Sequence, residues 1–168
     1  VFPPSADAVN PGELRRLLEE HRLKLAAVGT GAGWVKQRLH LALPQPAQRQ
    51  KAKDFIRSII DFAGQFGAPA IIGSMQGRSG DGVDAASARQ YLAQALEELG
   101  EHADQYSVPL IYEPLNRYET NQVNRVDDGL ALLDGLSTGN VVLLCDLFHM
   151  NIEEADIAAA LRRAGPRV

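Results

Sequence analysis

The sequence has little cysteine, no basic cluster and no long apolar run, and each shortage excludes a class of protein. Cys145 is the one cysteine, which excludes an internal disulfide framework and leads us to expect a reducing, cytoplasmic setting. No apolar segment approaches the roughly 20 residues that a membrane span needs. The formal net charge of −4, without any Lys/Arg cluster, argues against a nucleic acid or a membrane surface as partner.

What the chain does contain is enough apolar sequence for one domain, because 45% of its 168 residues are hydrophobic. Short apolar runs alternate with stretches of helical period. Strands are expected at 23–31, 68–77, 108–115 and 140–148, and residues 1–4 read as the end of another. Helices are expected at 12–21, 46–66 and 84–106, after a cap at Asn124, and at 153–165. This alternation predicts a buried parallel sheet, either open and doubly wound or closed as a (β/α)8 barrel.

Two glycine-rich stretches were candidates for nucleotide binding, and neither fits a known fingerprint. "GTGAGW" at 29–34 has Trp34 where a dinucleotide site needs its third glycine, and "GRSGDGVD" at 77–84 lacks the Lys-Ser/Thr pair of a phosphate loop. We therefore interpret both stretches as turns.

Polar side chains follow two of the expected strands, in "YEPLNRYET" (112–120) and "CDLFHMN" (145–151). Glu113 and Asp146 stand at the two strand ends, where neighbouring strands about 4.8 Å apart would let them share a divalent cation. Oxygen ligands with one imidazole favour Mg²⁺ or Mn²⁺. The structural alternative is that both carboxylates pair with Arg117 or cap the helices that follow.

"EPLNRYETN" followed about thirty residues later by "DLFHMNIEE" resembles the sugar isomerase and epimerase family with the xylose-isomerase-like barrel, especially its ketose 3-epimerase and hydroxypyruvate isomerase branches. The resemblance implies an α/β fold, a (β/α)8 TIM barrel, with one divalent metal ion, Mn²⁺, Mg²⁺ or Co²⁺. It implies that Glu113 is a metal ligand and the catalytic acid/base, and that Asp146 is a second ligand. Glu119 and His149 would bind substrate hydroxyls and carbonyl.

The resemblance also concerns length, because a barrel of this kind takes about 250 residues. Residues 1–168 are expected to form a single barrel domain from the end of its second strand to its sixth helix, without its N-terminal unit and strands seven and eight. The family's remaining His and Glu ligands would then follow Val168. A homo-oligomer remains open, since an incomplete barrel exposes two sheet edges.

The expected reaction is proton transfer on a small-molecule sugar or hydroxy-keto substrate, through a metal-stabilised enediolate. The sequence does not decide between epimerisation and aldose–ketose isomerisation. Trp34, Phe2 and Met75 are candidates for the wall of the sugar pocket, or for the core. Three alternatives stay open: an inosose dehydratase-type lyase, a DNA-repair endonuclease of the same superfamily, which the negative charge disfavours, and a non-enzymatic scaffold.

Overall fold

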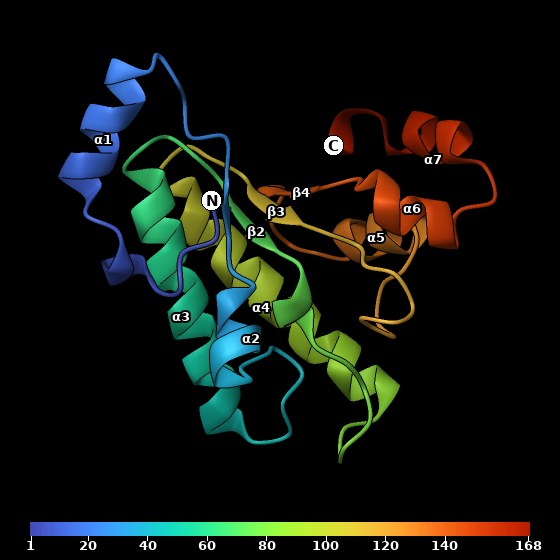
Figure 1. The fold of residues 1–168 in the computed structure, drawn as a ribbon. Helices are drawn as coiled ribbons and strands as arrows, with labels where there is room; N and C mark the ends of the chain where they lie inside the picture. The colour runs from blue at the N-terminus through green and yellow to red at the C-terminus, as the bar shows by residue number, and fades with distance from the viewer.

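The computed structural model describes residues 1–168, which build one parallel sheet with helices packed along it (Figure 1). The strands are β1 (Val28–Gly29), β2 (Ala70–Ile72), β3 (Leu110–Tyr112) and β4 (Val141–Leu143). They lie in the order β1-β2-β3-β4, and every neighbouring pair is parallel. A doubly wound sheet reverses its strand order at a switch point, whereas a barrel adds each strand beside the previous one. The observed order is that of a barrel.

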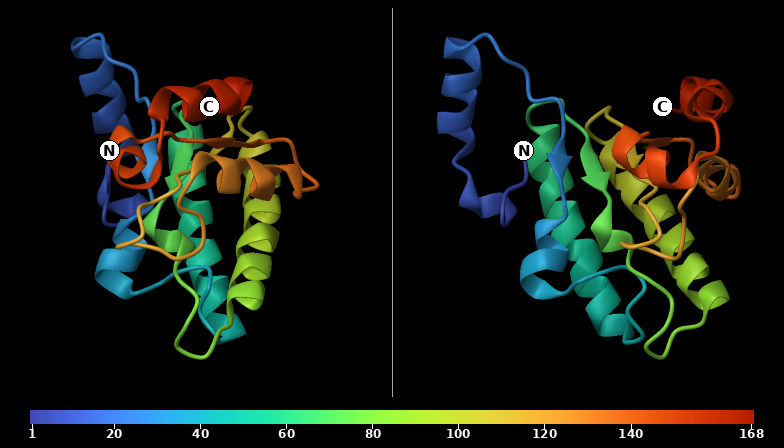
Figure 2. Two further views of the ribbon diagram at one scale, coloured as in Figure 1. Left: turned by 90° about the vertical axis from the view of Figure 1, so that its right-hand side faces the viewer. Right: turned by 45° about the vertical axis from the view of Figure 1, so that its right-hand side comes forward.

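Helices connect the strands and cover one side of the sheet (Figure 2). The α-helices are α1 (Pro11–Glu20), α2 (Ala32–Gln37), α3 (Pro46–Gly64), α4 (Ala85–Asp104), α5 (Val126–Asp134), α6 (Leu147–Glu153) and α7 (Ile157–Ala164). The short 3₁₀ helices are η1 (Ala6–Ala8), η2 (Ser74–Gln76) and η3 (Gly165–Arg167). Helices α3 and α4 pack against each other, and α5 packs against both α7 and β4. No helix combines the length and apolar composition that crossing a membrane would require.

The core lies between the helices and one face of the sheet. In each of the last three strands the first and third residues are buried, as in Leu110 and Tyr112 of β3. The central residues, Ile71, Ile111 and Val142, are only half-buried on the opposite face. The apolar runs therefore predicted the strands, but complete burial holds for the helix-covered face alone.

The first residue extends the sheet beyond β1. The backbone nitrogen of Val1 donates to the carbonyl of Ala27 (3.2 Å), and the N–H of Gly29 donates to the carbonyl of Val1 (2.8 Å). Bonds from one residue to both neighbours of Val28 are the pattern of a parallel pair. The expectation that residues 1–4 carry the end of a strand thus agrees with the hydrogen bonding at Val1.

Several helix ends are confirmed. The Asn10 side chain accepts a hydrogen bond from the Glu13 N–H (3.0 Å) and so caps α1, and Gly165 ends α7 with a positive φ of 52°. The predicted cap at Asn124 is wrong. Its amide donates instead to the carbonyls of Leu115 and Thr120. Arg125 occupies the N-cap position, and α5 begins at Val126.

The stretch after β4 also differs from the prediction. The strand was expected to run to residue 148 and the helix to begin at 153, but β4 ends at Leu143 and α6 begins at Leu147. The cause is Asp146, whose carboxylate accepts a hydrogen bond from the Phe148 N–H (2.7 Å) and so caps α6. The continuous apolar run gave no indication of this short helix. The last helix begins only at Ile157, with Asp156 as its cap.

Candidate functional site

The two polar stretches meet at the carboxyl ends of β3 and β4. Glu113 directly follows β3, and its backbone N–H continues the ladder by donating to the carbonyl of Ile72 (2.9 Å). The register pairs Tyr112 with Leu143, so Leu144 lies level with Glu113 and Asp146 comes two residues later. The two carboxylates are therefore not at matching heights, and the turn into α6 brings Asp146 back toward Glu113.

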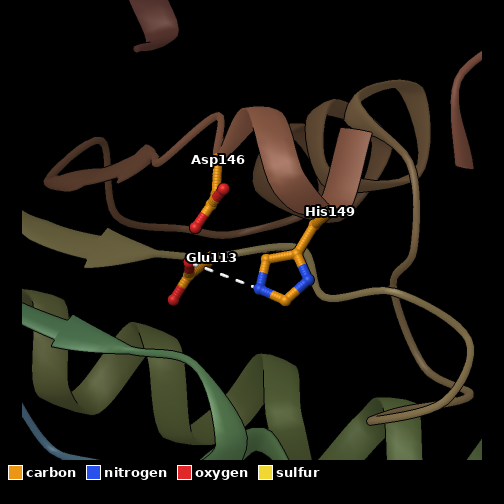
Figure 3. A group of neighbouring side chains, drawn as sticks. All are labelled: Glu113, Asp146 and His149. Atoms are coloured by element: carbon orange, nitrogen blue, oxygen red, sulfur yellow. Dashed lines mark ion pairs between the residues drawn. The ribbon is translucent and has the colours of Figure 1, made fainter. Parts of the chain in front are cut away.

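Glu113, Asp146 and His149 form one cluster of potential metal-ligating groups. One ligand atom from each lies within 4.8 Å of the other two. Figure 3 shows the side chains of Asp146 and His149, from the start of α6, directed toward Glu113 at the end of β3. His149 Nε2 lies 3.7 Å from Glu113 Oε1. The predicted proximity of the two carboxylates is confirmed, and the imidazole joins them.

The Glu113 carboxyl is held where its ionised form is disfavoured. Its side chain is only 16% exposed, and burial is the largest cause that raises its pKa to about 7 from an ordinary 4.5. The nearby carboxylates of Asp146 and then Glu119 raise this pKa further. The cluster is thus short of positive charge and contains a carboxyl that titrates near neutral pH, as an acid/base group requires.

The orientation of His149 is fixed by the loop after β3. The buried ring accepts the backbone N–H of Asn116 at Nδ1 (3.2 Å), and the Asn116 side-chain nitrogen lies 2.8 Å from the same atom. Because Nδ1 must offer its lone pair to that N–H, the ring proton resides on Nε2. The Nε2–H therefore faces Glu113 and is available as a hydrogen-bond donor.

The loop after β3 also positions a third carboxylate, that of Glu119. The Asn116 amide donates to Glu119 Oε1 (3.0 Å), and Glu119 Oε1 lies 3.8 Å from His149 Nδ1. Arg117 does not pair with Glu113 or Asp146, as the structural alternative supposed. It binds Glu153 of α6 through its backbone N–H (2.6 Å), Nε and Nη2 (both 2.9 Å). The other half of that alternative, helix capping, is correct for Asp146 and wrong for Glu113, because Asp146 caps α6 whereas Glu113 caps no helix.

A fully buried glutamine holds the backbone at Glu113. Gln76 of η2 donates from Nε2 to the carbonyls of Glu113 (3.0 Å) and Gly73 (3.1 Å). Its Oε1 accepts the hydroxyl hydrogen of Tyr112 (2.6 Å). Both polar atoms of the Gln76 amide are therefore engaged. Their bonds connect η2, which follows β2, to Tyr112 and Glu113 at the end of β3.

Sequence reasoning found Glu113, Glu119, Asp146 and His149, and the structure brings all four together. It missed the residues that orient them: Gln76, Asn116 and Glu153. Asn116 and Glu153 lie inside the quoted motifs and could have been weighed there. Gln76 gives no signal in a single sequence, because only the sheet register places it against Glu113.

Two members of the cluster, Glu113 and His149, line a small hollow of about 140 Å³, hereafter the reaction pocket. Glu113, Glu119 and His149 contribute its polar wall, and Phe2 and Ser74 lie on its other sides. Of the other residues expected at the wall, Met75 is fully buried in the core, and Trp34 faces a neighbouring cavity. The stretch 77–84 is a turn, as interpreted, and precedes α4, but the interpretation of 29–34 is wrong: Gly29 ends β1, and residues 32–34 begin α2, a helix that was not expected.

The donor set fits a hard divalent cation. Two carboxylates converge, one of them largely buried, and no Lys or Arg pairs with either, so a cation would offset the repulsion that raises the Glu113 pKa. Carboxylate oxygens are the ligands that Mg²⁺ and Mn²⁺ take. Glu113 and Asp146 supply these oxygens, while the Asn116 hydrogen bond suits His149 to donate rather than to ligate.

Comparison with known families gives a match over almost the whole chain. The family model described as "Xylose isomerase-like TIM barrel" matches residues 2–168. Among characterised proteins, an L-ribulose 3-epimerase of Methylomonas sp. is 30% identical over 155 residues, which cover 90% of this chain and 52% of that protein. An L-ribulose 3-epimerase of Mesorhizobium japonicum is 40% identical over 74 residues, which cover 44% of this chain and 25% of that protein.

Solved structures agree on the fold. A D-psicose 3-epimerase crystallised in the presence of D-fructose superposes with a TM-score of 0.83 at 23% identity, over 100% of this chain and 59% of that one. A D-allulose 3-epimerase of Methylomonas sp. gives 0.82 at 26% identity, over 99% and 58%. The chain thus spans about half the length of the relatives it matches most broadly.

Proposed function

Since this chain belongs to the xylose isomerase-like TIM barrel family, we propose that it carries an acid/base residue and two metal ligands of a divalent-metal-dependent sugar epimerase. The observation that supports this most is the convergence of Glu113, Asp146 and His149 within 4.8 Å at the carboxyl ends of two strands. Active sites of barrel enzymes lie at this end of the sheet. The names of the relatives, epimerases of ketoses, point to a ketose as the substrate class.

Glu113 is the residue proposed to move the proton. A carbon-bound proton beside a ketone is weakly acidic, so the base that removes it must be both close and able to hold the proton at neutral pH. Without a cation the pKa of Glu113 is about 7, and burial in the reaction pocket shields the carboxyl from competing water.

Glu113 and Asp146 are the residues proposed to hold Mn²⁺, Mg²⁺ or Co²⁺. When bound, the cation would stabilise negative charge that develops on the substrate's carbonyl oxygen. The Nε2–H of His149 supplies a hydrogen bond to a substrate oxygen on the same side of the pocket. Glu119, steadied by Asn116, accepts from a substrate hydroxyl and so fixes which carbon faces Glu113.

Solvent-proton exchange tests the proposal directly. The intact protein is incubated with Mn²⁺ in D₂O with D-fructose, D-allulose or L-ribulose, and NMR follows deuterium entering the carbon beside the ketone. We expect exchange together with formation of the epimer, and loss of both in Glu113→Gln. The matched control is Glu101→Gln, at an exposed position of α4 where the carboxylate makes no ion pair or hydrogen bond.

The same spectra separate the alternatives. A lyase of the dehydratase type would release water and give a dicarbonyl product instead of an epimer. A binding scaffold would give neither exchange nor product with any ketose, and that outcome would contradict the proposal.

A further inference from the structure

A second cavity of about 290 Å³ adjoins the reaction pocket, and no part of the proposed chemistry uses it. It lies between the loop that follows α2, residues 38–44, and the loop that precedes α4, residues 77–81. Ser74 and Glu119 line both hollows, so the two adjoin at these residues. We refer to it as the side cavity.

The lining of the side cavity contains several donors and acceptors that are not engaged. The hydroxyls of Ser74 and Ser79 and the carboxylate of Asp81 make no side-chain hydrogen bond within the protein. Arg78 forms no ion pair, and its guanidinium donates to the carbonyl of Tyr118 (3.1 Å). His40 accepts the Ala42 N–H at Nδ1 (3.2 Å), which leaves its Nε2–H as a free donor. The ring of Trp34 adds apolar surface beside them.

The loop 77–81, on one side of the cavity, is held in place by close packing and hydrogen bonds. Gly77 has φ +77°, and a Cβ at this position would lie 2.2 Å from Nδ1 of His40. The imidazole can therefore lie against the loop only because residue 77 is glycine. Thr120 locks the same loop by donating its hydroxyl hydrogen to the Gly77 carbonyl (2.7 Å). Asn121 exchanges two hydrogen bonds with the backbone of Ser79 (2.8 and 3.1 Å).

The charges of the lining identify the kind of ligand. The lining carries one guanidinium, that of Arg78, and two carboxylates, those of Asp81 and Glu119, so a phosphate or another anion would meet net repulsion. Burial lowers the pKa of His40, so its ring adds no charge at neutral pH. Neutral hydroxyl groups, by contrast, can both donate to carboxylates and accept from Arg, His and Ser. An aromatic ring beside such groups suits the apolar C–H face of a sugar ring.

The volume indicates how much sugar the side cavity can hold. Because a bonded heavy atom takes only about half the volume of a water molecule, the roughly six heavy atoms of a free ketose that would extend from the reaction pocket fill about a third of its 290 Å³. A hexosyl group, with about eleven heavy atoms, fills a little over half of it and is accommodated. We infer that the side cavity binds a glycosyl group, so that the substrate is a ketose or keto-sugar carrying a second sugar rather than a free monosaccharide. This inference rests on the proposed function of the neighbouring pocket.

Paired substrates test the inference. The intact protein with Mn²⁺ is assayed by deuterium exchange on D-fructose and on two glucosyl-fructoses, isomaltulose (6-linked) and leucrose (5-linked). We expect kcat/KM for at least one glucosyl-fructose to exceed that for D-fructose about tenfold or more, the effect of two additional hydrogen bonds. If D-fructose reacts as well as both disaccharides, the inference fails and the proposed epimerase stands. If no ketose reacts, the proposed function fails and the inference with it.

A blocking variant separates the side cavity from the reaction pocket. Ser79→Trp fills the cavity without removing a hydrogen bond, because both bonds of Ser79 come from its backbone. Calorimetry measures binding of isomaltitol and of sorbitol, which lack the carbonyl and cannot react. We expect wild type to bind isomaltitol about tenfold more tightly than sorbitol, and Ser79→Trp to lose this preference. Ser137→Trp, at an exposed serine in the loop before β4, is the matched control and should keep it. An unchanged preference in Ser79→Trp would overturn the inference.

Discussion

Glu113→Gln should stabilise the metal-free protein above neutral pH, although it removes the proposed base. The folded protein raises the Glu113 pKa from 4.5 to about 7, so ionising this carboxyl costs more in the folded than in the unfolded state. At 1.36 kcal/mol per pKa unit, the full cost is about 3 kcal/mol. Glutamine keeps the shape of the side chain and cannot ionise, so the variant avoids that cost.

The sign of the effect follows from where each state holds its proton. Below about pH 4.5 both states are protonated, and the raised pKa has no effect on stability. Between pH 4.5 and 7 the unfolded chain loses the proton while the folded protein keeps it, so stability falls as the pH rises. Above pH 7 both states are ionised, and the folded state bears the whole cost.

Urea unfolding with a chelator present, at pH 5 and pH 8, measures this effect. We expect the stability of Glu113→Gln relative to wild type to increase by about 2.5 kcal/mol between the two pH values. Asp146→Asn should leave most of the wild-type pH dependence, because burial rather than Asp146 is the larger cause. Glu101→Gln should show no pH-dependent difference. A change below about 1 kcal/mol for Glu113→Gln would refute the reasoning, since it would mean that the carboxyl ionises in the fold at its ordinary pKa.

Three further substitutions test the groups around Glu113. His149→Ala should raise KM and lower kcat while bound Mn²⁺ stays stoichiometric by elemental analysis; loss of the metal would make His149 a ligand. Gln76→Leu should cost about 2 kcal/mol in urea unfolding and lower kcat more than it raises KM, because the Glu113 backbone loses its amide partner. Unchanged kcat would limit Gln76 to a structural role. Glu153→Gln should cost about 2 kcal/mol and increase amide exchange at Arg117; unaltered exchange would mean that other contacts hold that loop.

The sequence predicted where the four strands and the long helices lie, because their apolar residues recur at regular spacing. It made the strands too long: β1 covers only Val28–Gly29 of the expected 23–31, and η2 occupies Ser74–Gln76 of the expected strand 68–77. It failed where one polar side chain overrides the local pattern. The run from 140 to 148 looks like one strand, but Asp146 caps α6, and the last two residues of the run belong to that helix. At Asn124, two carbonyl partners outside the helix compete for the side chain, so helix capping is lost.

The sequence likewise predicted some features of the candidate site and not others. Residue types and their positions after strands predicted that Glu113 and Asp146 lie close together, and the structure confirms this proximity. The sequence could not reveal that the strand register offsets these residues by two positions, or that Asn116 and His149, thirty-three residues apart, share a hydrogen bond. Both facts depend on how neighbouring units pack, and no local pattern encodes that packing.

The reacting groups and the side cavity come from different parts of the chain. Glu113, Asp146 and His149 belong to the segments after β3 and β4, whereas the loops that line most of the side cavity follow β1 and β2. Loops of a barrel can change length and composition while the strands beneath them stay fixed. If the proposed function holds, grafting new sequences into 38–44 and 77–81 should therefore change which substituents are bound while the proposed acid/base residues stay unchanged. Natural divergence and directed evolution could both exploit that separation.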